Sequence, residues 1–341
     1  MQVVNYILDI FMIEKITMKY ILVIDEGTSH TRAILFDLNG NILKIKEYEL
    51  TQFFPKPGWV EHCAEEIWLH TKMAIQAVCS DIDVSDIVSC GLTNQRETCL
   101  LWNKKTGKPL SKAIVWQDRR TQDICNQLKF AEDDVFQRTG LKLDPYFSAS
   151  KLKWLIDYHQ LSNFDDIAFG TIDSYLIFCM TGGRLHATDI TNASRTLLFN
   201  IHDKQWDSEL LNLFSIPQNL LPQVLDCDAD YGDLTKDIVG REIPIRGVIG
   251  DQQASIVGVG AMSNGKAKVT YGTGGFVMCN TGTKPFIQSS GLLATIAYQL
   301  KGQCFYALEG NIYDAGANLS WLKNNLGLIE HYADAEKLAE S

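Results

Sequence analysis

The sequence predicts a mixed α/β protein made of two related domains that face each other across a cleft. Strand-like and helix-like segments alternate throughout the 341 residues, a length that suits roughly two domains of about 100–200 residues each. Two similar segments, each a strand, a turn rich in Gly and Thr, and a second strand, lie around Gly27-Thr28 and Gly272-Thr273 and indicate a repeated unit. We predict a first domain over residues 19–255 and a second, incomplete domain over residues 256–341.

The predicted elements begin with an antiparallel meander. Three runs of β-favouring residues are separated by polar turns: Tyr20–Ile24, Arg32–Asp37 and Ile42–Leu50. Helical patterns follow over residues 64–79, 121–129 and 150–158. Residues 87–92 are expected to form a buried strand with 99–102 as its hairpin partner, and a later strand at 245–249 is expected to lead into a helix over 252–260.

Composition and charge narrow the class of partner. The formal charge of −10 and the absence of any Lys/Arg block argue against a nucleic-acid site or an anionic membrane surface, so we expect a small-molecule ligand. The nine cysteines form no C-x-x-C pair, which is typical of reduced thiols in the cytoplasm.

The first 18 residues are expected to be an extension that the native protein lacks, with Met18 as the true start. Their apolar stretch has no Lys or Arg ahead of it and is interrupted by Asp9 and Glu14, unlike a signal peptide. No other apolar run approaches the ~18–20 residues of a membrane span, so no membrane insertion is expected.

The two Gly/Thr turns are candidate phosphate sites. Backbone N–H groups and hydroxyls at such turns can converge on an anion, and Asp25 at the end of the first strand could lie beside Mg²⁺, through water. Either turn alone would more simply be a hairpin, but the pair, with Asp25 and Arg32 flanking the first, favours phosphate. Because no G-x-x-x-x-G-K-[ST] motif is present, any ATP site is not a P-loop.

A second group of polar residues could bind a polyol. Arg96 offers several donors and Glu97 two acceptors, and vicinal hydroxyls require both; an exposed hairpin tip with a surface ion pair is the alternative. Asp251 is either the N-cap of the helix after it or a general base, with Gln252 holding the substrate. Trp116, Tyr146 and Phe276 could line the carbon face of the polyol, although core packing is the default for each.

Several sequence blocks together resemble the FGGY family of carbohydrate kinases, whose fold is the ribonuclease H-like, actin-like ATPase fold. The blocks occur in the family's order: IDEGTSHTRAILFD, FPKPGWVEH, GLTNQRET, AIVWQDRRT, TGLKLDPYFSASKLKW, FGTIDSYLI, TDITNASRTLLFNI, GDQQA, YGTGGF and YALEGNIYDAGA. The NQRET and DPYFS blocks favour glycerol over larger sugars. The resemblance implies transfer of the γ-phosphoryl group of MgATP to glycerol, in glycerol catabolism, and the formation of homo-oligomers.

The resemblance also implies roles for individual residues. Asp251 would be the catalytic base. The glycerol-binding residues would be Arg96, Glu97, Trp116, Tyr146, Asp251, Gln252 and Phe276. The residues that contact ATP or ADP would be Thr28, Ser29, His30, Arg32, Thr273, Gly316 and Ser320, with Asp25 near Mg²⁺.

The sequence departs from the family's pattern at several points. Glu26 replaces Gln in the first turn, and a carboxylate there should weaken phosphate binding unless its side chain points away. His30 adds an imidazole to the same turn, and Ser320 stands where Gln is common near the nucleotide. The chain is also shorter than the family's members, so an inactive remnant that only binds glycerol is an alternative. An actin-like or chaperone-like ATPase is a further one, which the NQRET and GDQQ residues disfavour.

Overall fold

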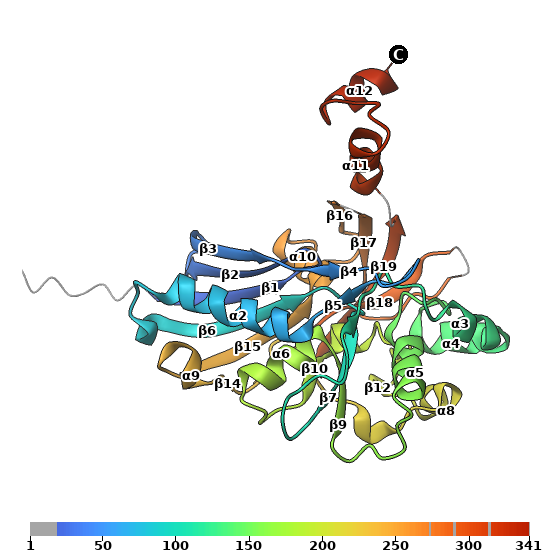
Figure 1. Cartoon of the computed structure of the whole chain (residues 1–341), viewed down its shortest axis with the longest axis horizontal. Coiled ribbons are helices and arrows are strands. Elements are labelled where there is room, and N and C mark those ends of the chain that lie inside the picture. The colour runs from blue at the N-terminus through green and yellow to red at the C-terminus, as the bar shows by residue number, and fades with distance from the viewer. Residues whose placement is uncertain (1–18, 273, 289–290, 313–314, 341) are drawn as a thin grey trace, which may run out of the picture.

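The computed structural model describes residues 19–272, 274–288, 291–312 and 315–340. Its largest sheet has six strands, of which β1, β2 and β3 form the predicted antiparallel meander while β1, β6 and β15 run parallel (Figure 1). Their order is β14 (Asp233–Leu234), β15 (Ile243–Gly250), β6 (Ile87–Asn94), β1 (Tyr20–Glu26), β2 (His30–Asp37) and β3 (Ile42–Glu49).

A second sheet lies next to the first and has five strands. Their order is β4 (Gln52–Phe53), β5 (Glu61–His62), β8 (Ala113–Ile114), β7 (Cys99–Asn103) and β9 (Ile167–Thr171). The predicted hairpin of residues 87–92 with 99–102 is therefore wrong, because β6 and β7 belong to different sheets. The segment between them does not reverse the chain onto itself but carries it from one sheet to the other.

The C-terminal part of the chain forms a four-stranded antiparallel sheet. Its order is β16 (Ala267–Tyr271), β17 (Gly275–Gly282), β19 (Gln303–Ile312) and β18 (Leu293–Leu300). The sheet packs through β18 on the short helix α7 (Ile190–Ala193), where Ala193 shares a buried cluster with Ala294 and Ile296. Two-stranded ribbons complete the strands: β10 (Ala187–Asp189) with β13 (Gln223–Leu225), and β11 (Phe199–Asn200) with β12 (Gln205–Trp206).

The helices cover the sheets and include the predicted ones. They are α2 (Ala64–Cys79), α3 (Gln122–Gln127), α4 (Glu132–Thr139), α5 (Ser148–Tyr158), α6 (Ile172–Met180), α7 (Ile190–Ala193), α8 (Ser208–Phe214), α9 (Lys236–Val239), α10 (Asp251–Gly258), α11 (Gly316–Asn324) and α12 (Asp334–Ala339). Short 3₁₀ turns occur at Val84–Asp86, Lys129–Ala131 and Gln218–Leu220. In the part of the chain that the structure describes, none of these helices has the length and apolar character that crossing a bilayer requires.

Helix α2 shows how the sequence positions the main core. Its first turn carries Glu65 and Glu66, which interact favourably with the helix dipole. Residues at helical spacing, among them Ile67, Ala74 and Val78, are buried against the six-stranded sheet.

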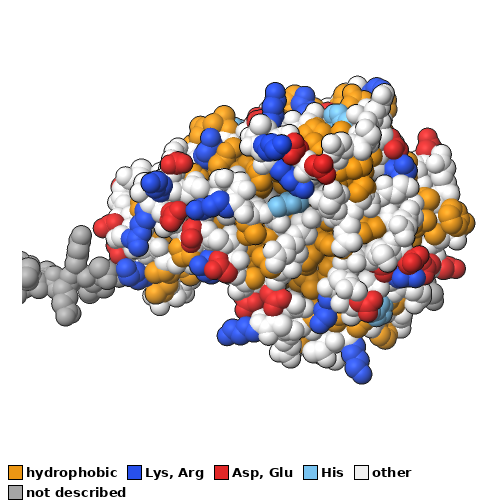
Figure 2. Space-filling view, turned by 90° about the horizontal axis from the view of Figure 1, so that it is seen from below, with side chains coloured by type: hydrophobic (Ala, Val, Ile, Leu, Met, Phe, Trp, Pro, Cys, Tyr) orange, Lys and Arg blue, Asp and Glu red, His pale blue; other side chains and the backbone are white. Residues whose placement is uncertain are grey.

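The surface carries charges of both signs. On the face seen in Figure 2, Lys and Arg side chains are interspersed with Asp and Glu. Helices α11 and α12 project from the C-terminal sheet (Figure 1), and they expose the large apolar side chains of Trp321 and Leu338. The division of the chain at residue 255 stays a prediction.

Gly140 provides a stability test of the contact between the N-terminal part and the C-terminal sheet. It ends α4 with φ of 73°, and a Cβ there would lie 2.3 Å from the Ala294 carbonyl oxygen. Gly140→Ala should lower the free energy of unfolding by roughly 2–4 kcal/mol, from backbone strain and overpacking together. Denaturant titration measures this change.

Gly240→Ala is the matched control, since Gly240 has φ of 85° but no atom within 4 Å of the added Cβ. Gly240→Ala should lower the free energy of unfolding by only about 1 kcal/mol, because backbone strain is then the only cost. Equal losses for the two variants would contradict the close approach of Gly140 to β18.

Candidate active site

The site forms where three parallel strands end at the same level. Glu26 and Gly250 are both paired with Asn94 in the register of the six-stranded sheet. The residues that follow β1, β6 and β15 therefore emerge along one edge, as is typical of ligand sites in sheets with parallel strands. This brings together segments that are far apart in the sequence.

A cavity of about 240 Å³ opens at this edge. Its lining combines polar, charged and aromatic residues from the N-terminal part with four residues of the hairpin formed by β16 and β17. The lining residues are Thr28, Ser29, Gln52, Gln95, Arg96, Glu97, Trp116, Gln117, Tyr146, Asp251, Gln252, Thr270, Gly272, Gly274 and Phe276. Both Gly/Thr turns thus border one cavity.

The segment from Asn94 to Thr98 is buried rather than an exposed tip. None of its residues is more than 2% exposed, which overturns the surface-loop alternative. The Gln95 amide N–H donates to the Glu26 carbonyl (2.7 Å), and the Asn94 and Asn192 side-chain amides exchange hydrogen bonds. Glu97 has φ of 61°, which turns the chain sharply between the sheets.

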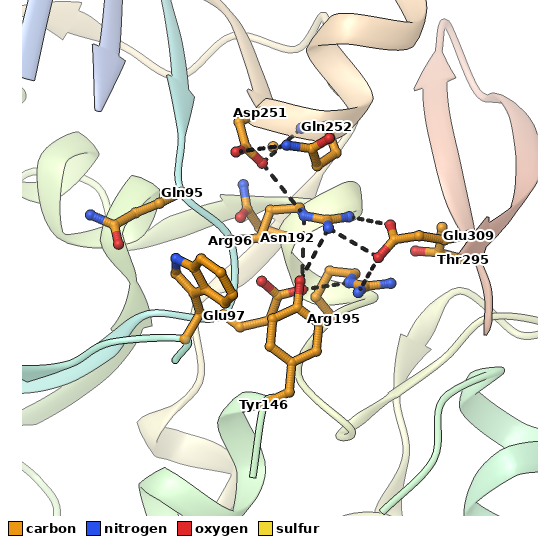
Figure 3. Close-up of polar contacts among 12 residues, drawn as sticks. Gln95, Arg96, Glu97, Tyr146, Asn192, Arg195, Asp251, Gln252, Thr295 and Glu309 are labelled. Atoms are coloured by element: carbon orange, nitrogen blue, oxygen red, sulfur yellow. Dashed lines mark hydrogen bonds and ion pairs between the residues drawn. The ribbon is translucent and has the colours of Figure 1, made fainter. Parts of the chain in front are cut away.

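Arg96 is the centre of the polar network (Figure 3). Its two terminal nitrogens donate to both carboxylate oxygens of Glu309 (2.7 and 3.1 Å). They also donate to Gln253 Oε1 (3.2 Å) and the Tyr146 hydroxyl (3.3 Å). The remaining donor, Nε, lies 3.5 Å from Asp251 Oδ1 and 3.8 Å from Glu97 Oε1.

Asp251 is not the N-cap of the following helix. The cap position belongs to Gly250, and Asp251 is the first residue of α10. Its carboxylate accepts hydrogen bonds from the Gln252 backbone N–H (2.7 Å) and side-chain amide (3.2 Å). Removal from bulk water raises the pKa of Asp251; Arg96 opposes this rise and Glu97 adds to it. The side chain remains 37% exposed, toward the cavity.

Three aromatic residues form one wall of the cavity. The Trp116 ring is 5.8 Å from that of Tyr146 and 6.3 Å from that of Phe276, both edge to face. Trp116 Nε1 donates to Thr28 Oγ1 (2.9 Å), so the aromatic wall is tied to the first Gly/Thr turn. All seven residues predicted to bind the polyol therefore line one cavity.

Only some of the residues predicted to contact the nucleotide line the cavity. Thr28 and Ser29 line the cavity, and the Gly316 N–H at the start of α11 donates to the Gly272 carbonyl (3.0 Å). Thr273 lies outside the described residues. His30 is not among the residues lining the cavity, and Ser320 Oγ lies 3.3 Å from the Tyr332 hydroxyl.

Arg32 and Asp25 pair with each other, and neither is among the residues that line the cavity. Arg32 Nη1 lies 3.0 Å from Asp25 Oδ2, and Arg32 Nε lies 2.8 Å from Glu47. Within the described ranges, no cluster of three or more His, Cys, Asp or Glu could hold a metal ion. Asp25 could thus contribute to a Mg²⁺ site only if phosphate oxygens or water complete the coordination, which is usual for Mg²⁺ in kinases.

Glu26 points away from the phosphate side. It is fully buried on the face of β1 opposite to Asp25, and it accepts a hydrogen bond from Thr31 Oγ1 (2.6 Å). Burial raises the pKa of Glu26 well above its usual value. The orientation of this side chain into the core therefore weakens the expected repulsion between Glu26 and a phosphate at the turn.

Several residues at the site were not predicted from the sequence. Gln52, Gln95 and Gln117 line the cavity, and Lys268 is buried beside it, donating to Gln252 Oε1 and Thr270 Oγ1. Arg195 and Glu309 complete the charged network. The buried carboxylate of Glu309 forms ion pairs with both Arg96 and Arg195.

Comparisons with known proteins agree with this architecture. The model of the N-terminal domain of the FGGY family of carbohydrate kinases matches residues 20–258, and that of the C-terminal domain matches residues 267–341. A glycerol kinase of Alteromonas mediterranea is 48% identical over 94% of this chain and 67% of its own length, and glycerol kinase 1 of Pseudomonas aeruginosa is 48% identical over 94% and 66%. This chain thus spans about two thirds of the length of these relatives.

Solved structures give the same picture. The crystal structure of Plasmodium falciparum glycerol kinase with ADP matches with a TM-score of 0.87 and 36% identity over 95% of this chain and 66% of that one. A gluconate kinase of Lactobacillus acidophilus, 23% identical over 91% of this chain and 63% of its own, has a TM-score of 0.81 and indicates the shared fold alone.

Lys268 gives a test of the electrostatics beside the cavity. Burial, with a smaller contribution from the charge of Arg96, lowers the pKa of Lys268 to about 8, whereas an unfolded Lys titrates near 10.4. Between about pH 8 and 10 the unfolded chain therefore binds more protons than the native one, and stability should rise with pH. Lys268→Met should remove this rise.

The measurement is denaturant unfolding of both chains from pH 7.5 to 10. Lys284→Met, which removes an exposed lysine after β17, is the control and should leave the pH dependence unchanged. The free energy of unfolding of the wild type, relative to that of Lys268→Met, should rise with pH. If this difference stays constant or falls with pH, the pKa of Lys268 is not lowered by burial.

Proposed function

This chain belongs to the FGGY family of carbohydrate kinases, and we propose that it transfers the γ-phosphoryl group of MgATP to glycerol, forming sn-glycerol 3-phosphate. The observation that carries the proposal is the convergence of one small cavity, a carboxylate with a raised pKa and two Gly/Thr turns. The names of the relatives and of the Plasmodium structure support glycerol as the substrate.

The chemistry of the cavity suits a small polyol. Each hydroxyl of glycerol both donates and accepts, and Arg96 Nε–H, the Glu97 carboxylate and the Gln252 amide supply the complementary groups. The aromatic wall of Trp116 and Phe276 offers an apolar surface to the carbon atoms. A cavity of about 240 Å³ is small, which favours a three-carbon substrate over a sugar.

Asp251 is the proposed general base. Its carboxylate would accept the proton of the terminal hydroxyl as that oxygen attacks the γ-phosphorus, and its raised pKa increases its strength as a base. Arg96 Nε, 3.5 Å away, would hold the polyol next to it. Phosphoryl transfer depends mainly on such positioning and on neutralisation of charge.

Backbone N–H groups of the two Gly/Thr turns, with the hydroxyls of Thr28 and Ser29, would hold the phosphates. The Plasmodium relative was solved with ADP, which supports an adenine nucleotide as the second ligand. Mg²⁺ bound with the nucleotide would neutralise phosphate charge, and Asp25 would help to hold it. Glycerol catabolism, a cytoplasmic location and homo-oligomer formation stay predictions from the sequence.

Replacement of Asp251 tests the proposal. Asp251→Asn keeps the shape of the side chain but removes the proton acceptor, so glycerol-dependent ADP release should fall by about 100-fold or more. The affinity for glycerol, measured by calorimetry, should stay within about fivefold, since Asn can still make hydrogen bonds.

Asp230→Asn is the control, because Asp230 is 69% exposed and pairs with Arg246 on the surface. It should leave both quantities unchanged. Turnover that survives in Asp251→Asn would exclude Asp251 as the base, and glycerol binding by the wild-type chain without ADP release would favour the glycerol-binding remnant instead.

A further inference from the structure

Four charged side chains form a closed group beneath the cavity. Two are the proposed glycerol ligands Arg96 and Glu97, and two, Arg195 and Glu309, have no role in the proposed function. None is more than 2% exposed. Two positive and two negative charges balance one another, as burial of charges requires.

Arg195 links the two carboxylates of this group. Arg195 Nε donates to Glu97 Oε1 (2.6 Å), and its Nη2 donates to Glu309 Oε1 (2.8 Å). Burial alone would raise the pKa of Glu309, but the charges of Arg195 and Arg96 outweigh burial and hold it at about 2. Glu309 is therefore ionised at any working pH.

The hydrogen bonds of Arg96 leave one donor for a ligand. A guanidinium has five N–H groups, and the four on the terminal nitrogens match the four acceptor contacts to Glu309, Gln253 and the Tyr146 hydroxyl. The fifth, on Nε, faces Asp251 at 3.5 Å, longer than a good hydrogen bond. The side chain is thus held with a single N–H available at the cavity.

Without this arrangement the guanidinium would interact differently with Asp251. A fork of two N–H groups pairs strongly with both oxygens of a carboxylate. Such a pair would occupy Asp251 and weaken it as a base, because a close positive charge stabilises its ionised form. Glu309 prevents this pairing by holding the fork on the opposite side.

We propose that Arg195 and Glu309 are positioning residues: they hold Arg96 and Glu97 in the orientation that binds the polyol and keep the Arg96 fork away from Asp251. This inference rests on the proposed function and adds two residues to its site. Glu309 belongs to β19, so the orientation of the glycerol ligands depends on the C-terminal sheet. The same hairpin sheet supplies Thr270, Gly272 and Gly274 to the cavity.

The test measures the dissociation constant for glycerol by calorimetry and the melting temperature, on the full chain. Glu309→Gln should raise the dissociation constant about tenfold or more, as expected for the loss of a charge-assisted contact. Asp207→Asn removes the charge of another buried carboxylate, which pairs with the half-buried Arg138 and does not line the cavity, and it should leave the constant within twofold.

The double variant Glu309→Gln with Arg195→Met separates positioning from charge balance. It restores a neutral group, so its melting temperature should recover relative to Glu309→Gln alone. The dissociation constant should stay raised, because Arg96 and Glu97 have then both lost the charged partners that orient them. Recovery of the constant to within twofold of wild type would overturn the proposal.

Glu309→Asp covers the case in which Glu309→Gln does not fold. It keeps the charge but withdraws the carboxylate by one methylene, so the glycerol constant should rise while the chain stays folded. A wild-type constant in this variant would overturn the positioning role. If the wild-type chain itself binds no glycerol, the proposed function falls together with this inference; if it binds glycerol and the variants match it, only this inference falls.

Discussion

The ion pair of Arg96 with Glu309 is the interaction on which the site depends. Both side chains are buried, and a buried charge without its partner is strongly destabilising. Arg96 follows the parallel strand β6, whereas Glu309 belongs to the C-terminal sheet. Their bidentate contact therefore requires the two sheets to meet at the cavity.

The rest of the site follows from the ends of the parallel strands. Because β1, β6 and β15 end together, Thr28, Arg96 and Asp251 are neighbours although their positions in the chain differ widely. Gly250 allows Arg96 to approach the backbone closely, because a Cβ at Gly250 would lie 2.9 Å from Arg96 Cγ. Backbone geometry thus brings Thr28, Arg96 and the proposed base Asp251 together. The buried network sets the orientations of Arg96 and Glu97.

The sequence predicted local structure well. Helix α2 has the predicted bounds and β3 ends one residue earlier than expected, because hydrophobic periodicity and an Asn-Gly turn are strong local signals. Glu97 and Gln252, which the sequence predicted as polyol ligands, both line the cavity, and their role as ligands stays a prediction.

The sequence patterns did not predict which strands pair, nor which charged residues far apart in the chain form ion pairs. The hairpin of β6 with β7 was wrong, since two adjacent apolar strands are equally compatible with different sheets. The N-cap interpretation of Asp251 failed because Gly250 takes that position. Arg195 and Glu309 were missed as ion-pair partners because they lie 114 residues apart and no local pattern links them. Thr273 cannot be compared, since it lies outside the described residues.

The central claim is that this cavity binds glycerol with one terminal hydroxyl at Asp251. A crystal structure of the chain grown with glycerol tests it most directly. The account predicts a glycerol molecule with a terminal hydroxyl in hydrogen-bond contact with the Asp251 carboxylate, another hydroxyl between Arg96 Nε and Glu97, and its carbons against Trp116 and Phe276. An empty cavity at saturating glycerol, or glycerol bound with no hydroxyl near Asp251, would contradict it.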